Sequence, residues 1–185
     1  MERLQESLEQ RYENREPDEL ADYIVNTHHK YVNQALPEIN GLCHNLARLQ
    51  GDAYPELIEI AGLFNKVTAE LKSHMLDEEN TLFPYIKQLA QVRRENRHLG
   101  RPPFGSIVNP IKAMETEHFE TAKNVQLIYE NSNQYTPPKG AGSDFKILYN
   151  KLDEFEKDLK EHIHLENNVL FPKAMELESE MWRTH

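Results

Sequence analysis

Apolar residues recur at steps of three and four along four long stretches of the chain, with polar residues between them. This spacing is the period of an amphipathic α-helix, and no stretch shows the alternation that is typical of a half-buried β-strand. The sequence therefore predicts four helices. They cover about residues 18–50, 57–89, 110–128 and 143–170.

Two prolines fall inside these stretches. Pro37 lies within the first one and should kink or split that helix, because proline has no backbone N–H to donate. Pro84 lies within the second and can bend it, but Tyr85, Ile86 and Leu89 continue the apolar pattern beyond it. The second helix is therefore expected to continue past its proline.

Polar segments rich in Gly and Pro join the helices, and 7 Gly in 185 residues favours long helices over a loop-rich β fold. A chain of this length fits one domain with a sizeable core. We therefore predict an all-α fold, an antiparallel up-down four-helix bundle. Residues 17–178 would form the bundle, residues 1–16 an N-terminal arm or short helix, and residues 179–185 a C-terminal tail.

The formal net charge of −10 argues against a nucleic-acid partner and against an anionic membrane surface, since both attract basic proteins. No apolar run approaches the length of a membrane span, and the first twenty residues lack the apolar core of a secretory signal. Cys43 is the single cysteine, so neither an internal disulfide nor a thiolate metal site is possible. We expect a cytoplasmic protein.

An internal repeat carries polar residues through the chain. The segment HMLDEENTLFP begins at His74 and HIHLENNVLFP begins at His162, and the two agree at the His, at a Glu four residues later, and at Asn, Leu, Phe and Pro. His29 precedes His74 by 45 residues, and His118 precedes His162 by 44. The repeat thus predicts two helical hairpins, each with one lone His and one His-x-x-x-Glu pair.

Residues four apart on a helix differ by about 6 Å in height and about 40° in direction, so each His and Glu pair shares a helix face. Both pairs lie among apolar residues that should face the core. Burying an imidazole and a carboxylate costs several kcal/mol unless another group compensates. A buried ion pair competes as the explanation for one copy, but the repetition favours metal coordination. The four residues are His74, Glu78, His162 and Glu166.

Four imidazoles and two carboxylates divide naturally between two ions. We expect two histidines per ion, with Glu78 and Glu166 bridging the ions together with a solvent-derived group. Nitrogen and oxygen ligands without thiolate suit iron or manganese, with zinc less favoured, and ligand type alone does not separate iron from manganese. Open coordination positions would let small molecules bind.

The positions of the remaining histidines indicate which of them can face the site. Adjacent helical residues point about 100° apart, so only one of His28 and His29 can face the site, and periodicity does not decide between them. His164 should face solvent, His98 lies in a connection, and His44 lies about 22 Å along a continuous helix from His29. Glu70 and Glu117 are candidate outer acceptors for the ligand imidazoles, although surface glutamate is the commoner outcome.

With these segments in view, the chain resembles the hemerythrin-like di-iron proteins, and among them the Repair of Iron Centers family. The resemblance is carried by HHKYVNQALPEI, SHMLDEENTLFP, METEHFE and EHIHLENNVLFP and covers about residues 20–176. It implies a hemerythrin-like bundle holding two non-haem iron ions, bridged by two glutamates and an oxo or hydroxo group. It also favours His29 over His28. The implied metal ligands are His29, His74, Glu78, His118, His162 and Glu166.

The resemblance further implies a metal-binding repair protein that supplies iron to damaged iron–sulfur clusters under nitrosative or oxidative stress, with iron–sulfur proteins as clients. Two departures bear on this. The small N-terminal Cys-Cys domain common in the family is expected to be missing, and Ala122 stands where oxygen-carrying hemerythrins have a further histidine, which should leave a coordination position open. The alternatives are an oxidoreductase acting on nitric oxide or peroxide, and a sensor that binds oxygen or nitric oxide.

Overall fold

The computed structural model describes residues 12–183, and every regular element among them is helical. Because all of these elements are helices, the all-α fold class is confirmed. Three of them, η1 to η3, are single turns of π-helix. In chain order the elements are α2 (Pro17–Ile24), η1 (Val25–His29), α3 (Lys30–Gln50), α4 (Glu56–Asp77), η2 (Glu78–Leu82), α5 (Phe83–Arg94), α6 (Val108–Asn131), α7 (Ser143–Leu165), η3 (Glu166–Leu170) and α8 (Phe171–Arg183).

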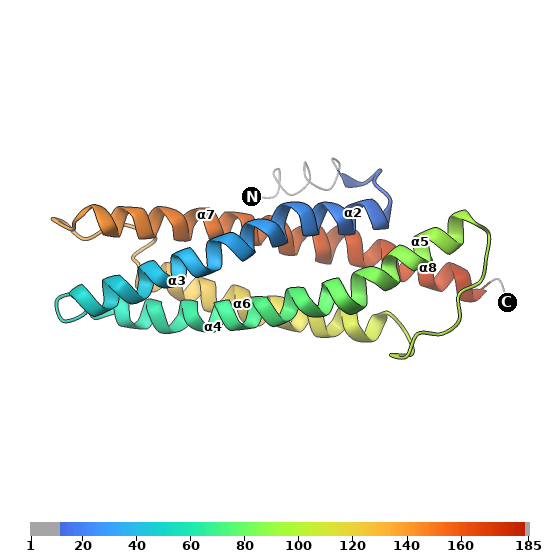
Figure 1. The fold of residues 1–185 in the computed structure, drawn as a ribbon, viewed down its shortest axis with the longest axis horizontal. Helices are drawn as coiled ribbons and strands as arrows, with labels where there is room; N and C mark the ends of the chain where they lie inside the picture. Colours follow the sequence, from blue (N-terminus) through green and yellow to red (C-terminus); the bar gives the residue numbers. More distant parts are fainter. Residues whose placement is uncertain (1–11, 184–185) are drawn as a thin grey trace. The chain divides into compact units, whose positions relative to one another are not determined.

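Residues 17–183 contain four continuous helical stretches, because the π-helical turns join α2 to α3, α4 to α5 and α7 to α8 without a break (Figure 1). They correspond to the four predicted helices. The last stretch differs at its end, since residues 179–183, assigned to a tail from the sequence, continue α8 as far as Arg183. Of the proposed N-terminal arm, residues 1–11 lie outside the described residues, as do residues 184 and 185 of the tail.

The second and third π-helical turns each precede a proline. The amide of Phe83 donates to the carbonyl of Glu78, and the amide of Phe171 donates to the carbonyl of Glu166, so each bond spans five residues instead of four. The proline that follows each phenylalanine has no N–H to offer the carbonyl four residues earlier. The α-helical hydrogen-bond register is therefore interrupted at a fixed place in both hairpins.

Of the two outcomes expected at Pro37, a kink or a split, the split does not occur. Pro37 lies inside α3, which continues from Lys30 to Gln50. The change in helix type occurs earlier, at η1, where the side-chain amide Nδ2 of Asn26 donates to the backbone carbonyl of Asp22 at 2.7 Å. A side-chain donor there can occupy a carbonyl whose helical partner has shifted.

The residues cluster into two compact units. The first comprises Met1–His29, His74–Thr116 and Glu161–His185, and the second comprises Lys30–Ser73 and Glu117–Lys160. The core of the first unit is apolar and comes mainly from α2, α5, α8 and the start of α6, with Leu20, Ile86 and Phe171 among its fully buried side chains.

The core of the second unit contains packed aromatic pairs. Phe64 lies edge-on to Phe155 with ring centroids 5.3 Å apart, and Phe145 packs between Tyr54 at 4.9 Å and Tyr149 at 5.7 Å. Such edge-to-face pairs add to the stabilisation from area burial alone. None of the helices that the structure describes is long and apolar enough to cross a membrane.

Within the first unit, a buried carboxylate fixes the beginning of α6. Glu178 of α8 is 6 % exposed and accepts hydrogen bonds from the Ile107 amide at 3.0 and 3.1 Å, from Ser106 Oγ at 2.6 Å and from Tyr85 Oη at 2.9 Å. Burial and the hydrogen bond to this carboxylate raise the pKa of Tyr85. A carboxylate at the start of a helix also interacts favourably with the helix dipole.

Candidate metal centre

The π-helical turns place three of the candidate ligands. His29 is the last residue of η1, Glu78 is the first of η2, and Glu166 is the first of η3. His74 and His162 lie one turn before the two glutamates, in α4 and α7. Single π-helical turns inside longer helices are found frequently at functional sites, and here each one coincides with a candidate ligand.

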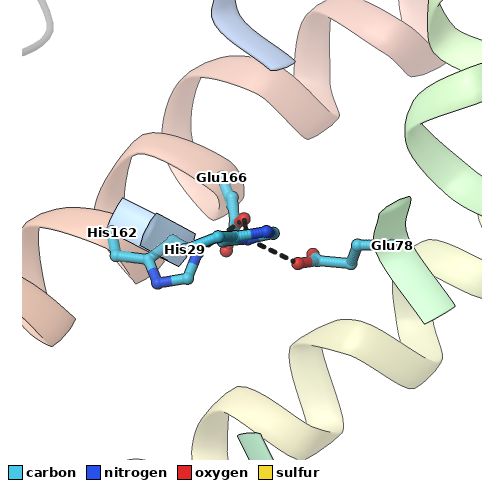
Figure 2. A group of neighbouring side chains, drawn as sticks. All are labelled: His29, Glu78, His162 and Glu166. Atoms are coloured by element: carbon cyan, nitrogen blue, oxygen red, sulfur yellow. Dashed lines mark hydrogen bonds and ion pairs between the residues drawn. The ribbon is translucent and has the colours of Figure 1, made fainter. Parts of the chain in front are cut away.

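One group of four side chains converges on a single point in the first unit. His29, Glu78, His162 and Glu166 each offer one ligand atom, and these atoms all lie within 4.8 Å of one another. Figure 2 shows the four side chains pointing toward one another, with His162 and Glu166 on one continuous helical stretch and His29 and Glu78 on two others. His29 Nε2 lies 3.3 Å from Glu78 Oε2 and 3.8 Å from Glu166 Oε1, and His162 Nε2 lies 2.9 Å from Glu166 Oε1.

The two carboxylates also face His74. Its Nε2 atom lies 3.4 Å from Glu78 Oε2, and ligand atoms of His74, Glu78 and Glu166 lie within 4.8 Å of one another. Glu78 Oε2 is thus about equally far from His29 and from His74. Both glutamates therefore belong to two neighbouring groups of ligand atoms, as bridging ligands would.

Burial makes this arrangement costly without a cation. Glu78 and Glu166 are fully buried, and His29, His74 and His162 are at most 3 % exposed. Neither carboxylate oxygen of Glu78 has a hydrogen-bond partner among the described residues. A buried carboxylate without hydrogen bonds is strongly destabilising, and a coordinated metal ion compensates it. The nitrogen and oxygen donors fit a first-row divalent metal ion.

The protonation of His29 reflects the same surroundings. Burial lowers its pKa, but the favourable interactions of its protonated ring with the Glu166 and Glu78 carboxylates outweigh burial and raise the pKa to about 10. On the other side of the ring, His29 Nδ1 donates to Glu79 Oε1 at 2.8 Å. This carboxylate is 37 % exposed, so it lies between the buried imidazole and solvent.

Glu79 was missed from the sequence. It follows Glu78 directly, and because two adjacent residues of a regular α-helix point about 100° apart, helical spacing does not indicate that both lie near one centre. The sequence-based candidates for outer acceptors were Glu70 and Glu117. In the second unit, Glu70 accepts a hydrogen bond from Asn124 Nδ2 at 2.9 Å and lies 3.6 Å from Lys66. The role suggested for Glu117 stays a prediction.

Both members of the His28–His29 pair are buried, which the argument from helix geometry did not anticipate. His29 joins the four-ligand group. His28 stacks on His162, with ring centroids 5.5 Å apart and planes 8° apart, and its other side meets the edge of Tyr23 at 5.8 Å. His28 therefore packs against the candidate ligand His162 without joining the four-ligand group.

His118 is 3 % exposed and lies in α6, at a position that belongs to the second unit. Its role as a ligand stays a prediction. Ala122 lies one turn after His118 and is exposed, and the open coordination position expected there stays a prediction.

The other histidines lie outside the four-ligand group. His44 is exposed and its Nδ1 bonds the carbonyl of Asn40 at 2.8 Å, one turn earlier in the same helix. His98 is exposed in the connection between α5 and α6. His164 is half-buried, where the sequence predicted a solvent-facing side chain.

Comparison with known proteins agrees with a cation-binding site in this helical chain. Residues 20–174 match the family described as the hemerythrin HHE cation binding domain. A probable iron-sulfur cluster repair protein of Haemophilus influenzae is 36 % identical over 157 residues, which cover 85 % of this chain and 65 % of that protein. The iron-sulfur cluster repair proteins YtfE of Escherichia coli O157:H7 and Citrobacter koseri are each 35 % identical, with coverage of 85 % and 66 %.

The chain therefore spans slightly less than two thirds of the length of these relatives. The matched segment contains all six residues that the sequence singled out as metal ligands. It also contains all three π-helical turns. The chain belongs to the hemerythrin HHE cation-binding domain family.

Proposed function

We propose that this chain binds two non-haem iron ions and takes part in the repair of iron–sulfur clusters by supplying iron. The observation that carries the proposal is the pair of fully buried carboxylates, Glu78 and Glu166, each shared between two groups of imidazole ligands. One ion would be held with His29 and His162, and the other with His74.

We propose His118 as the second imidazole of the His74 position. Ile111 and Met114 on α6 pack in the core of the first unit. His118 follows them at spacings of seven and four residues, so the three side chains share one face of the helix. Its 3 % exposure agrees with a ligand role, and the internal repeat pairs it with His29.

The residues of the chain have distinct roles in this proposal. The histidines would hold the ions, and the two glutamates would bind them and offset their positive charge. The bound irons supply reversible one-electron redox chemistry and exchangeable coordination. Carboxylate and imidazole ligands hold ferrous iron less firmly than thiolates hold soft metals, which is consistent with release of an ion to a client.

The names of the relatives support cluster repair as the purpose of the site, and iron–sulfur proteins damaged by nitric oxide or peroxide are the clients we propose. The test combines metal analysis with transfer. The chain loaded anaerobically with ferrous iron should hold two ions and restore activity to an iron–sulfur enzyme whose cluster has been destroyed by nitric oxide.

Two variants sharpen the experiment. Glu78→Gln should lose at least one ion and most of the transfer, because Glu78 serves both positions. His44→Gln changes an exposed histidine outside the centre and should behave as the unsubstituted chain does. A chain that holds two irons but restores no client activity would contradict the repair function.

A further inference from the structure

The two imidazoles of the four-ligand group are held in different ways. His29 Nδ1 donates to Glu79 Oε1 at 2.8 Å, which is the kind of outer hydrogen bond that metal-ligating histidines almost always make. His162 Nδ1 is buried and has no hydrogen-bond partner among the described residues. Only its Nε2 atom has a printed polar contact, to Glu166 Oε1 at 2.9 Å, so other contacts must set the orientation of this ring.

Two neighbouring imidazoles pack against His162. The ring of His28 lies almost parallel to it, with planes 8° apart and centroids 5.5 Å apart. This is an offset-stacked arrangement, which stabilises aromatic pairs beyond the area that they bury. His29 meets the same ring at a tilt of 59° with centroids 4.9 Å apart, and Figure 2 shows these two imidazoles next to each other. His162 thus contacts the rings of two consecutive residues.

Both of these rings come from the π-helical turn η1, which ends in His28 and His29. Adjacent side chains of a regular α-helix point about 100° apart, so contact of both with one imidazole is not expected there. Both are nevertheless buried, with exposures of 2 % and 1 %. The pair therefore contributes one candidate ligand, His29, and one ring that packs on another ligand, His28.

His28 is itself held by a second aromatic contact. Tyr23 of α2 meets its ring edge-on, with planes 78° apart and centroids 5.8 Å apart. Tyr12 Oη donates to Tyr23 Oη at 2.9 Å, and the Arg15 guanidinium lies over both tyrosine rings at 5.2 and 5.1 Å. All of these residues belong to the first unit. The ring of His28 therefore has little freedom to turn, as the support of another side chain requires.

We propose that His28 is a positioning residue of the metal centre, which fixes the imidazole of His162 by stacking so that its Nε2 atom faces the ion. This inference rests on the proposed function for the presence of an ion at His162 and is independent of cluster repair. His28 does not itself bind the ion. Because stacking depends on a flat ring and not on a hydrogen-bonding group, different replacements at position 28 separate the two.

The test uses zinc, which has no redox chemistry and whose affinity follows from competition with a chelator. His28→Leu removes the flat ring and should weaken the binding of at least one ion by about 2- to 12-fold, the range expected for one aromatic pair. His28→Phe keeps a flat ring without nitrogen atoms and should restore most of the affinity. His28→Gln supplies hydrogen-bonding groups without a ring and should resemble His28→Leu.

A matched control and a second measurement separate this effect from general destabilisation. His44→Leu makes the same replacement at an exposed histidine of α3 and should leave the affinity unchanged. Circular dichroism of the metal-free variants checks that each is as helical as the unsubstituted chain. The second measurement needs no variant: in the NMR spectrum of the zinc-loaded chain, nuclear Overhauser effects should connect the ring protons of His28 and His162.

Three results would overturn the inference: equal zinc affinity in His28→Leu and the unsubstituted chain, an affinity of His28→Phe no higher than that of His28→Leu or His28→Gln, or no Overhauser effect between the two rings with zinc bound. A chain that binds no zinc would contradict the proposed metal centre and the role of His28 together. The expected response at position 28, in a chain that restores no client enzyme when loaded with iron, would support the role of His28 and contradict the repair function.

Discussion

His29 lies among three carboxylates, one of them partly exposed and two of them buried, and these determine how its affinity for metal depends on pH. Glu166 and Glu78 raise its pKa to about 10 although burial lowers it. A ligand imidazole must release its Nε2 proton before it coordinates, so metal and proton compete for the same atom. Below pH 10 each ion bound at His29 should displace one proton.

We therefore expect the apparent affinity for a redox-silent ion such as zinc to rise with pH from about 6.5 to about 10, by at most about tenfold per pH unit. Competition with a chelator of known affinity, corrected for the titration of the chelator, measures this rise. The variant His29→Gln should flatten it. An affinity that is independent of pH in the unsubstituted chain would show that His29 does not bind the metal.

At the scale of elements, the helices were predictable and the π-helical turns were not. The spacing of His74 to Glu78 and of His162 to Glu166 requires only a regular helix, and the apolar period supplied that. A π-helical turn arises from a local change in hydrogen-bond register, and this leaves the apolar period almost unaltered. Glu79 and His28 were missed for this reason, since both contact site residues from within such turns.

Pro37 shows the opposite case. Proline is a strong sequence signal for a break in a helix, and here it lies inside a continuous one. Proline inside a helix costs about 3 kcal/mol, and α3 nevertheless continues through it. The face that α3 buries carries several large apolar side chains, among them Leu36 and Ile39 on either side of the proline. Packing of that face outweighs one missing hydrogen bond, whereas residue-by-residue reasoning has no measure of packing.

Glu178 gives a prediction about the beginning of α6. Replacing it with Ala would leave the buried Ile107 amide and the Tyr85 hydroxyl without their acceptor, at about 1–3 kcal/mol for each group. We expect Glu178→Ala to lower the free energy of unfolding by about 2–6 kcal/mol, and Glu178→Gln to lower it less. Urea denaturation of the metal-free protein measures both. Equal stability of Glu178→Ala and the unsubstituted chain would contradict this anchoring role.

For the molecule as a whole, the buried polar ligands of the candidate centre lower the stability of the fold unless an ion binds them. Five of the proposed ligands lie buried in the first unit, and two of them are carboxylates. Any ion that binds the native state and not the unfolded chain stabilises it by mass action. Stability and metal content are therefore expected to change together.

The stability of the metal-free protein should also depend on pH through His29. Without metal, the folded-state pKa of His29 lies above its ordinary value of 6.5, at about 10, so its protonated form stabilises the fold fully below pH 6.5. That stabilisation should be lost as pH rises toward 10, by at most about 1.4 kcal/mol per pH unit. Each kcal/mol corresponds to about 2–4 °C in melting temperature for a chain of this size.

Bound metal offsets this loss, because an ion replaces the proton on His29 and binds better as the proton is lost. At a free metal concentration 100 times the dissociation constant, the added stability is about 2.7 kcal/mol, and it should grow with pH where that of the metal-free protein falls. Thermal melts with zinc and with chelator at pH 6.5, 8 and 9.5 compare the two directly. The curves should diverge with pH, and parallel curves would mean that the ion and the His29 proton do not share a site.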